Sequence, residues 1–166
     1  ILLTPWRHLR EKGAIALDNG VHLADVQSYL AGSPWTEVWG RGFIAVPVRL
    51  RTEEAVFAAD MYTEAMENAP AEVHATAEDS IIALYRLANG ASATLTWLPA
   101  GPGHQYLERS LHGRHGSMLI PSDRSGKDLT LRLGGRELGA RELLAELGPD
   151  TISEVEQRLF PDPVHP

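Results

Sequence analysis

Cysteine is absent from this chain of 166 residues, and basic residues are the minority among its charges. Without cysteine there is no disulfide framework, no thiolate nucleophile and no Cys-ligated zinc or iron–sulfur site. No apolar run approaches the roughly 18 residues that a membrane-spanning helix needs. Lys and Arg number 15 against 22 Asp and Glu, a net charge of −7. Since phosphate contacts need clustered basic residues, we expect neither a nucleic-acid binder nor a membrane protein.

Three sequence motifs are also missing. The chain has no G-x-G-x-x-G after a strand and no G-x-x-x-x-G-K-[ST], so it has no recognisable phosphate cradle of its own. It has no G-x-S-x-G nucleophile elbow either. The first residue is Ile1 rather than Met, and nothing at the start is typical of a signal peptide. We therefore expect a cytoplasmic protein whose sequence is a processed product or a piece of something longer.

The composition that remains is that of a folded domain. Hydrophobic residues make up 43% and charged residues 22%, which is ordinary for a globular protein. We expect a single domain over residues 1–160 and a loose tail at 161–166, where the sequence carries no packing signal. A three-and-four spacing of apolar residues predicts a helix over 19–31, which Gly32 and Pro34 should end.

Most of the chain after this helix has the two-residue period of β-strands. Strands are predicted over 36–50 (interrupted by Gly40 and Gly42), 73–77, 106–112, 117–120 and 129–133. A hairpin is predicted over 80–98, with Asn89-Gly90 as a type I′ turn. Further helices are predicted over 53–68, 141–147 and 152–159. Hairpin-linked strands with helices before and after indicate an α+β fold with an open, mainly antiparallel sheet and helices packed on one face.

One stripe of the first predicted helix is polar. Asp18, His22, Asp25 and Tyr29 are spaced by four, three and four residues. A carboxylate four residues before a histidine can stack against it and orient it, and an imidazole exchanges protons near neutral pH. The structural alternative is that Asp18 caps the helix and His22 packs at its edge.

Other residues are weaker candidates. His104 follows a loop rich in glycine and proline, where ligand contacts are common, although a solvated loop residue is the more usual case. Trp6 and Arg7 place an aromatic ring and a cation upstream of the helix. His112 and His115 could be drawn as metal ligands, but no third ligand stands at a fixed spacing, so no metal site is predicted.

Taken in order, these features resemble the start of the C-terminal domain in the Gfo/Idh/MocA oxidoreductase family. The family pattern there is G-G-G-x-x-x-D-x-G-x-H-x-x-D, followed by a short helix ending in Gly. The matching segments are Trp6-Arg7, Lys12 to Asp25, Tyr29 to Gly32, Glu78-Asp79-Ser80, Asn89-Gly90-Ala91 and Gly113 to Ser117. The chain departs from the pattern at Lys12-Gly13-Ala14, where only the middle glycine of the triple remains.

The resemblance implies a substrate-binding domain that works beside an N-terminal Rossmann domain, which this chain lacks. Such enzymes transfer hydride between a sugar or polyol hydroxyl carbon and NAD or NADP, and the fragment alone would bind no cofactor. By position, His22 matches the acid–base histidine and Asp18 its carboxylate partner. Arg7, Trp6, Asp25 and His104 are then expected to contact substrate. A lysine from the Rossmann half would complete the catalytic set.

Two hypotheses follow from the sequence. In the first, the chain is the catalytic half of a sugar or polyol dehydrogenase and forms a homodimer through its exposed sheet face. In the second, it is a non-catalytic dimerisation or ligand-sensing module with the same fold. The substrate, the choice between NAD and NADP and the direction of reaction do not follow from the sequence.

Overall fold

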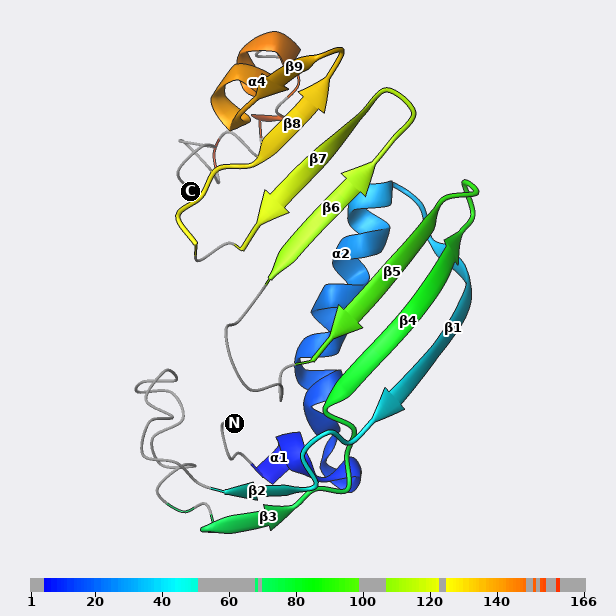
Figure 1. The fold of residues 1–166 in the computed structure, drawn as a ribbon, viewed down its shortest axis with the longest axis vertical. Coiled ribbons are helices and arrows are strands. Elements are labelled where there is room, and N and C mark those ends of the chain that lie inside the picture. Colours follow the sequence, from blue (N-terminus) through cyan, green and yellow to red (C-terminus); the bar gives the residue numbers. More distant parts are fainter. Residues whose placement is uncertain are drawn as a thin grey trace. The chain divides into compact units, whose positions relative to one another are not determined.

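The computed structural model describes residues 5–50, 68, 70–98, 107–122, 125–148, 151, 153, 154 and 158, with the backbone alone at residues 5 and 6. Within these residues, short helices are followed by antiparallel strands (Figure 1). The chain divides into two compact units, Ile1–Gly103 and His104–Pro166. The first unit carries the candidate site.

Helical segments open the first unit. They are α1 (Pro5–His8), the 3₁₀ helix η1 (Arg10–Lys12), the π-helix η2 (Ala16–Gly20) and α2 (Val21–Ala31). The helix predicted over 19–31 is confirmed by α2 and the end of η2. The π-helical turn was not predicted, because the apolar spacing that marks a helix does not distinguish a local π turn from an α turn.

Helix α2 ends as its sequence predicts. Gly32 adopts the left-handed conformation at φ +58°. The N–H of Ser33 donates to the carbonyl of Ser28 at 3.2 Å, and the N–H of Gly32 donates to that of Tyr29 at 3.1 Å. These two bonds form a Schellman motif, which satisfies the last carbonyls of the helix.

The main sheet of the first unit has strand order β1–β4–β5, all antiparallel. Its strands are β1 (Trp35–Phe43), β4 (Ser80–Leu87) and β5 (Ser92–Trp97). Along β4, Ala83, Tyr85 and Leu87 are buried, whereas Ile82 and Leu84 are exposed. The alternation gives the sheet one packed face and one open face.

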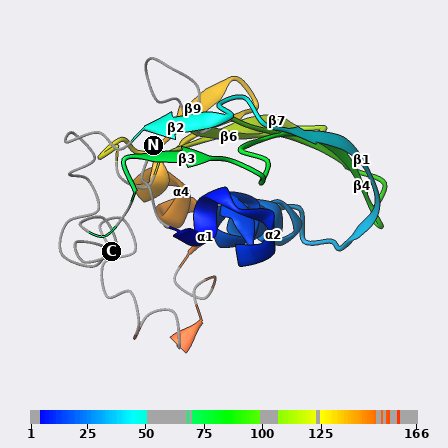
Figure 2. The same cartoon turned by 90° about the horizontal axis from the view of Figure 1, so that it is seen from below.

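Helix α2 lies on the packed face. A Cβ atom built at Gly20, where η2 meets α2, would lie 3.9 Å from side-chain atoms of Ile81 and Trp97. The amide of Gln27 donates to the carbonyl of Thr94 on β5 at 3.0 Å. In Figure 2, α1 and α2 lie on the same side of β1 and β4. Helix packing on one face of an antiparallel sheet is thus confirmed for this unit.

The glycines of β1 do not interrupt the strand, contrary to the prediction. β1 runs through Gly40 and Gly42, and its register shift lies between Trp35 and Glu37 instead. A Cβ at Gly40 would stand 2.8 Å from the carbonyl oxygen of Ile82 on β4. Glycine is therefore required there for close approach of two strands rather than for a break.

The predicted β4–β5 hairpin is confirmed, but its turn is not type I′. That turn needs positive φ at both central residues, and Asn89 does not have it, whereas Gly90 has φ +86°. The N–H of Gly90 donates to the carbonyl of Leu87 at 3.0 Å, and the N–H of Leu87 donates to that of Ala91 at 2.9 Å. This is a type I turn followed by a left-handed glycine in a G1 bulge.

A short ladder completes the first unit. Strand β2 (Val48–Leu50) pairs antiparallel with β3 (Glu72–His74). The strand predicted over 73–77 is confirmed in its first part, while the strand predicted over 36–50 divides into β1 and β2. The helix predicted over 53–68 lies outside the described residues except for residue 68.

The second unit is a four-stranded antiparallel meander in the order β6–β7–β8–β9. Its strands are β6 (Glu108–His112), β7 (Gly116–Pro121), β8 (Thr130–Leu133) and β9 (Arg136–Leu138). The three strands predicted in this part are confirmed. β9 was missed because its three residues are too short to show a period.

Helix α4 (Ala140–Leu147) follows the meander and confirms the helix predicted over 141–147. Its first turn is capped by acceptors from two places. The N–H of Ala140 donates to Asp128 at 3.1 Å, and the N–H of Gly139 donates to Glu142 at 3.0 Å. Carboxylates at a helix N-terminus satisfy free N–H groups and oppose the positive end of the dipole. Of the helix predicted over 152–159, only residues 153, 154 and 158 are described.

The observed elements confirm the α+β class. Every strand pair among the described residues is antiparallel.

Candidate functional site

Helix α2 and the π-helix before it present the polar residues that the sequence singled out. His22, Asp25 and Tyr29 are exposed along α2, and Asp18 lies in the middle of η2. π turns are rare and occur frequently at functional sites. The local conformation therefore agrees with a functional role for this part of the helix.

The carboxylate of Asp18 is held by Arg7. The Nε atom of Arg7 lies 2.6 Å from Oδ2 of Asp18, and the two side chains are 11% and 29% exposed. The amide of Asn19 donates to the same oxygen at 3.1 Å. A charge-assisted hydrogen bond of this length, largely shielded from water, gives the carboxylate a fixed position.

His22 does not make the contact with Asp18 that the four-residue spacing predicted. Within the part of the chain described, its imidazole has no hydrogen bond or ion pair. The π-helical turn accounts for this difference, because it hydrogen-bonds from i to i+5 and so takes Asp18 out of the α-helical i, i+4 register with His22. His22 is thus an open imidazole four residues from a fixed negative charge.

The remaining predicted site residues have different settings. Asp25 is exposed on α2, and the backbone of Trp6 belongs to α1. The Trp6 side chain and the whole of His104 lie outside the described residues. Arg7 is nearly buried and is directed to Asp18. Contact of these residues with substrate stays a prediction.

Two histidines of the second unit lie at its first turn. His112 and His115 are exposed at and beside the β6–β7 turn. Among the described residues, no group of three His, Cys, Asp or Glu side chains could hold a metal ion.

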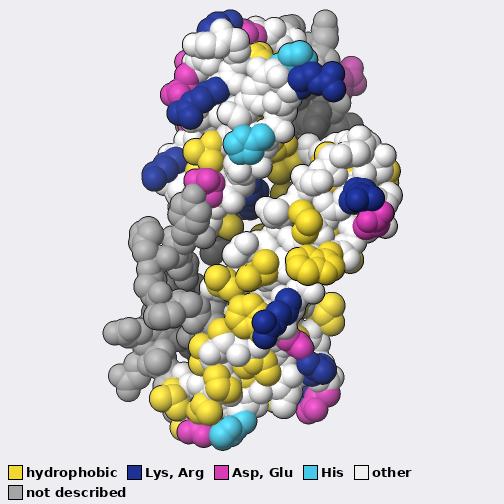
Figure 3. All heavy atoms as spheres, turned by 45° about the vertical axis from the view of Figure 1, so that its right-hand side comes forward, with side chains coloured by type: hydrophobic (Ala, Val, Ile, Leu, Met, Phe, Trp, Pro, Cys, Tyr) yellow, Lys and Arg dark blue, Asp and Glu magenta, His cyan; other side chains and the backbone are white. Residues whose placement is uncertain are grey.

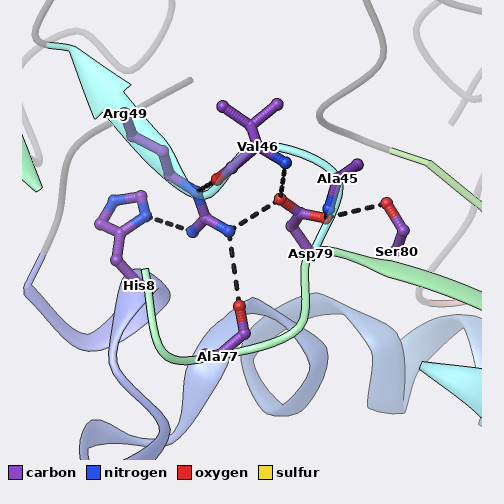
Figure 4. A network of polar contacts seen from close by, with 7 residues as sticks. All are labelled: His8, Ala45, Val46, Arg49, Ala77, Asp79 and Ser80. Atoms are coloured by element: carbon purple, nitrogen blue, oxygen red, sulfur yellow. Dashed lines mark hydrogen bonds and ion pairs between the residues drawn. The ribbon is translucent and has the colours of Figure 1, made fainter. Parts of the chain in front are cut away.

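A buried polar cluster lies beside α1 (Figure 4). The guanidinium of Arg49 donates to Asp79 at 2.8 Å, to Nδ1 of His8 at 2.7 Å and to the carbonyl of Val46 at 3.1 Å. All three charged or titratable side chains, His8, Arg49 and Asp79, are 2% exposed or less. A buried charge is tolerated only when it is paired and hydrogen-bonded, and this cluster meets that condition.

The cluster also determines which nitrogen of the His8 imidazole carries the proton. A guanidinium has only donors, so Nδ1 of His8 accepts, and the ring is neutral with its proton on Nε2. The backbone of His8 is held as well, because its carbonyl accepts from the N–H of Thr76 at 3.0 Å and from that of Ala77 at 3.1 Å.

Asp79 is the most heavily bonded member of the cluster. Its carboxylate accepts from the N–H of Ala45 at 2.7 Å, from the N–H of Val46 at 3.0 Å and from the hydroxyl of Ser80 at 2.9 Å. Burial alone would raise the pKa of the Asp79 carboxyl, but these bonds and the charge of Arg49 outweigh it and hold the pKa below the ordinary 3.8.

Sequence reasoning missed this cluster. Asp79 was noted only as part of a landmark before β4, and neither His8 nor Arg49 was singled out. One signal could have found Arg49, which stands between Val48 and Leu50 in an otherwise apolar segment. An arginine at a buried strand position needs a carboxylate partner.

The fold places the chain in one class: an α+β domain built on antiparallel sheets, with exposed polar side chains along helix α2. The chain belongs to the GFO/IDH/MocA C-terminal domain family, which its sequence matches over residues 3–119. A comparison with curated proteins found no match.

Solved structures share this fold. Levoglucosan dehydrogenase in complex with NADH and levoglucosan matches with a TM-score of 0.59 and 19% identity, over 81% of this chain and 33% of that one. An oxidoreductase domain protein from Kribbella flavida matches with a TM-score of 0.55 and 18% identity, over 75% and 30%. The transcriptional regulator Gal80p from Kluyveromyces lactis matches with a TM-score of 0.54 and 19% identity, over 83% and 34%.

The chain spans about a third of the length of these proteins. At such identities the likeness shows a common fold and does not by itself transfer an activity. Among the helices described, none is both long and apolar enough to cross a bilayer.

Proposed function

We propose that this chain is the substrate-binding and catalytic half of a cytoplasmic oxidoreductase. The enzyme would move a hydride between the hydroxyl carbon of a sugar or polyol and NAD or NADP. The observation that carries the proposal is the exposed imidazole of His22, four residues from an Asp18 carboxylate that Arg7 fixes at 2.6 Å. Levoglucosan dehydrogenase, a protein of the same fold solved with NADH and levoglucosan, supports this substrate class.

The proposed chemistry divides between the chain and the cofactor. Oxidation of an alcohol removes a proton from oxygen and a hydride from carbon, and the nicotinamide accepts the hydride when it is bound. His22 would accept the hydroxyl proton, a role that an imidazole performs near neutral pH. Asp18, whose carboxylate Arg7 holds, would be the acidic partner of this histidine that the resemblance implies. Asp25, Trp6 and His104 would contact the substrate.

The cofactor would be bound by a domain outside these residues. A Rossmann cradle needs parallel βαβ units, whereas the strand pairs of the described residues are antiparallel. As the resemblance implies, that domain would also supply a lysine to the site. Arg7 would act mainly through Asp18 and would also contact the substrate.

The test is His22→Ala in the full-length protein, assayed with a panel of sugars and polyols and both cofactors. We expect kcat to fall by about 10²- to 10⁴-fold, the usual contribution of a general base. The dissociation constant of the nicotinamide should change less than about twofold, because His22 acts on the substrate. His115→Ala, an exposed histidine of the second unit, is the matched control. Unchanged turnover in His22→Ala would remove the catalytic assignment.

A second candidate is a non-catalytic dimerisation or ligand-sensing module. It is favoured by the likeness to Gal80p, a protein named as a transcriptional regulator, and by the lack, among the described residues, of the His22–Asp18 contact that a catalytic pair would make. This candidate predicts that a sugar raises the melting temperature of the full-length protein without any turnover. Turnover by the wild type in the same panel excludes it.

We further propose that the protein forms a homodimer through the open face of the β1–β4–β5 sheet. The cross-strand register places Trp39, Ile82 and Leu84 on this face, and they are 79%, 49% and 45% exposed. Figure 3 shows exposed hydrophobic side chains on this unit, with charged ones beside them; the same register places Glu37, Arg41 and Arg86 on this face. Contiguous apolar surface on a sheet is typical of an interface.

A further inference from the structure

We propose that the buried cluster of His8, Arg49 and Asp79 is a positioning device for the candidate site. It fixes helix α1, and α1 in turn holds Arg7 against Asp18. The inference rests on the proposed function and assigns a role in it to three residues that are buried from solvent.

The first step is that the cluster immobilises His8. Its side chain is bound to Arg49 at 2.7 Å, and its carbonyl accepts two backbone N–H groups from residues 76 and 77. The guanidinium is in turn fixed by the Asp79 carboxylate and by two carbonyls, those of Val46 and Ala77. Because His8 is held through both side chain and backbone, the end of α1 has little freedom.

The second step is that the anchoring of His8 also sets the position of Arg7. Arg7 precedes His8 in the four-residue helix α1, so the direction of its side chain depends on where His8 is anchored. Its guanidinium reaches across eleven residues of sequence to Asp18. The chain of contacts therefore runs from Asp79 through Arg49, His8 and Arg7 to Asp18.

The third step concerns what such a cluster contributes. Replacing a buried ion pair by well-packed apolar residues is often neutral or stabilising, so stability alone is a weak reason for placing one here. The forked guanidinium of Arg49 fixes the geometry of its partners, because it binds a carboxylate and an imidazole in set directions. Misplacement of a catalytic group by about 1 Å can lower a rate about 10²-fold, so geometry of this kind has a catalytic consequence.

The experiment is a double-mutant cycle in the full-length enzyme. The variants are Arg7→Gln, His8→Leu and the double variant, with kcat, KM and cofactor affinity measured for each. We expect His8→Leu to lower kcat about tenfold, with cofactor affinity unchanged. In the Arg7→Gln background, His8→Leu should lower kcat by less than about twofold. The loss is smaller there because the link from His8 to Asp18 through Arg7 is already removed.

Two further variants separate positioning from folding. His8→Asn keeps an acceptor near the place of Nδ1 and should restore most of kcat, whereas His8→Leu cannot. Arg49→Lys keeps the buried charge but loses the fork, and it replaces His8→Leu in the cycle if that variant does not fold. Arg132→Gln, which breaks the exposed pair with Glu137 in the second unit, is the control and should leave kcat unchanged.

The outcomes distinguish this inference from the proposed function. The positioning role is wrong if His8→Leu lowers kcat by the same factor in the wild-type and Arg7→Gln backgrounds. It is also wrong if the kcat of His8→Asn is no higher than that of His8→Leu. In both cases the proposed function stands. If His22→Ala keeps full turnover in the same assay, the proposed function itself fails. Loss of kcat in His22→Ala together with strong non-additivity in the cycle supports both.

Discussion

Arg49 and Asp79 form an ion pair at 2.8 Å whose side chains are 1% and 2% exposed. The pair Arg86–Glu37, at a similar distance of 2.9 Å, is 64% and 62% exposed. The contrast matters because a buried charge that loses its partner retains its full desolvation penalty, whereas an exposed one is resolvated.

We therefore expect Asp79→Ala to lower the free energy of unfolding by about 3–5 kcal/mol, the usual cost of breaking a buried pair from one side. Glu37→Ala should cost less than about 1 kcal/mol, since an exposed pair contributes little. Urea denaturation followed by circular dichroism measures both. Equal effects of the two substitutions would contradict the buried character of the cluster.

The same carboxylate predicts a dependence of stability on pH. The pKa of Asp79 in the folded protein lies below its ordinary 3.8, so folding favours the ionised form. Its stabilisation is complete above about pH 4–5 and is lost as the pH falls through 3.8 toward the lower folded pKa. Melting temperatures between pH 6 and pH 2.5 should therefore fall less steeply in Asp79→Asn, itself less stable at pH 6, than in the wild type. Parallel curves would argue against a depressed pKa.

Two glycines should tolerate no side chain. A Cβ at Gly40 would stand 2.8 Å from a carbonyl oxygen of β4, and one at Gly116 would overlap the carbonyl oxygen of Arg132 on β8. We expect Gly40→Ala and Gly116→Ala each to cost about 2 kcal/mol or more, because backbone must move. Gly20→Ala is the control, since its Cβ would meet nothing closer than 3.9 Å. It should be neutral or stabilise the helix by up to about 1 kcal/mol.

The cap of α4 can be tested in the second unit. Asp128 accepts from the N–H of Ala140 at 3.1 Å and from that of Leu129 at 2.8 Å. Asp128→Ala should cost about 1 kcal/mol and increase amide hydrogen exchange in the first turn of α4. Glu108→Ala changes an exposed side chain that has no partner among the described residues and should leave exchange in α4 unchanged. Equal exchange in both variants would contradict the cap.

The proposed dimer predicts a change in mass. Leu84→Arg would place a charge in the centre of the open face and should shift the protein to monomer in sedimentation equilibrium. Tyr29→Arg alters an even more exposed hydrophobic residue on α2, 77% exposed against 45% for Leu84, and should leave the mass unchanged. A wild type that is monomeric at micromolar concentration would end the dimer proposal.

The sequence was sufficient for most elements because their signals are local. The spacing of Leu23, Val26 and Leu30 predicts α2, and Gly32 predicts where it ends. Alternation along 80–87 predicts β4 and its two faces. Asn89-Gly90 predicts the hairpin but not its turn, because the sign of φ at Asn89 depends on the loop length that strand pairing selects.

The site was predicted less completely because its contacts are not local. Asp18 and His22 were identified from spacing, but the partner of Asp18 proved to be Arg7, eleven residues away. The buried cluster joins His8, Arg49 and Asp79 across 71 residues of sequence, a pairing that a single sequence without alignment does not contain. The burial of these three side chains, which the sequence does not show, is what distinguishes them from the other polar residues of the chain.

The π-helical turn over Ala16–Gly20 places an unusual constraint on chain length. Each residue of an α-helix advances the chain by about 100° and 1.5 Å. Deleting one residue from this turn would let α2 continue backward as a regular helix, and Asp18 would then rotate out of reach of Arg7. The segment between α1 and α2 should therefore accept few insertions or deletions, so that homologous chains would keep the same number of residues there.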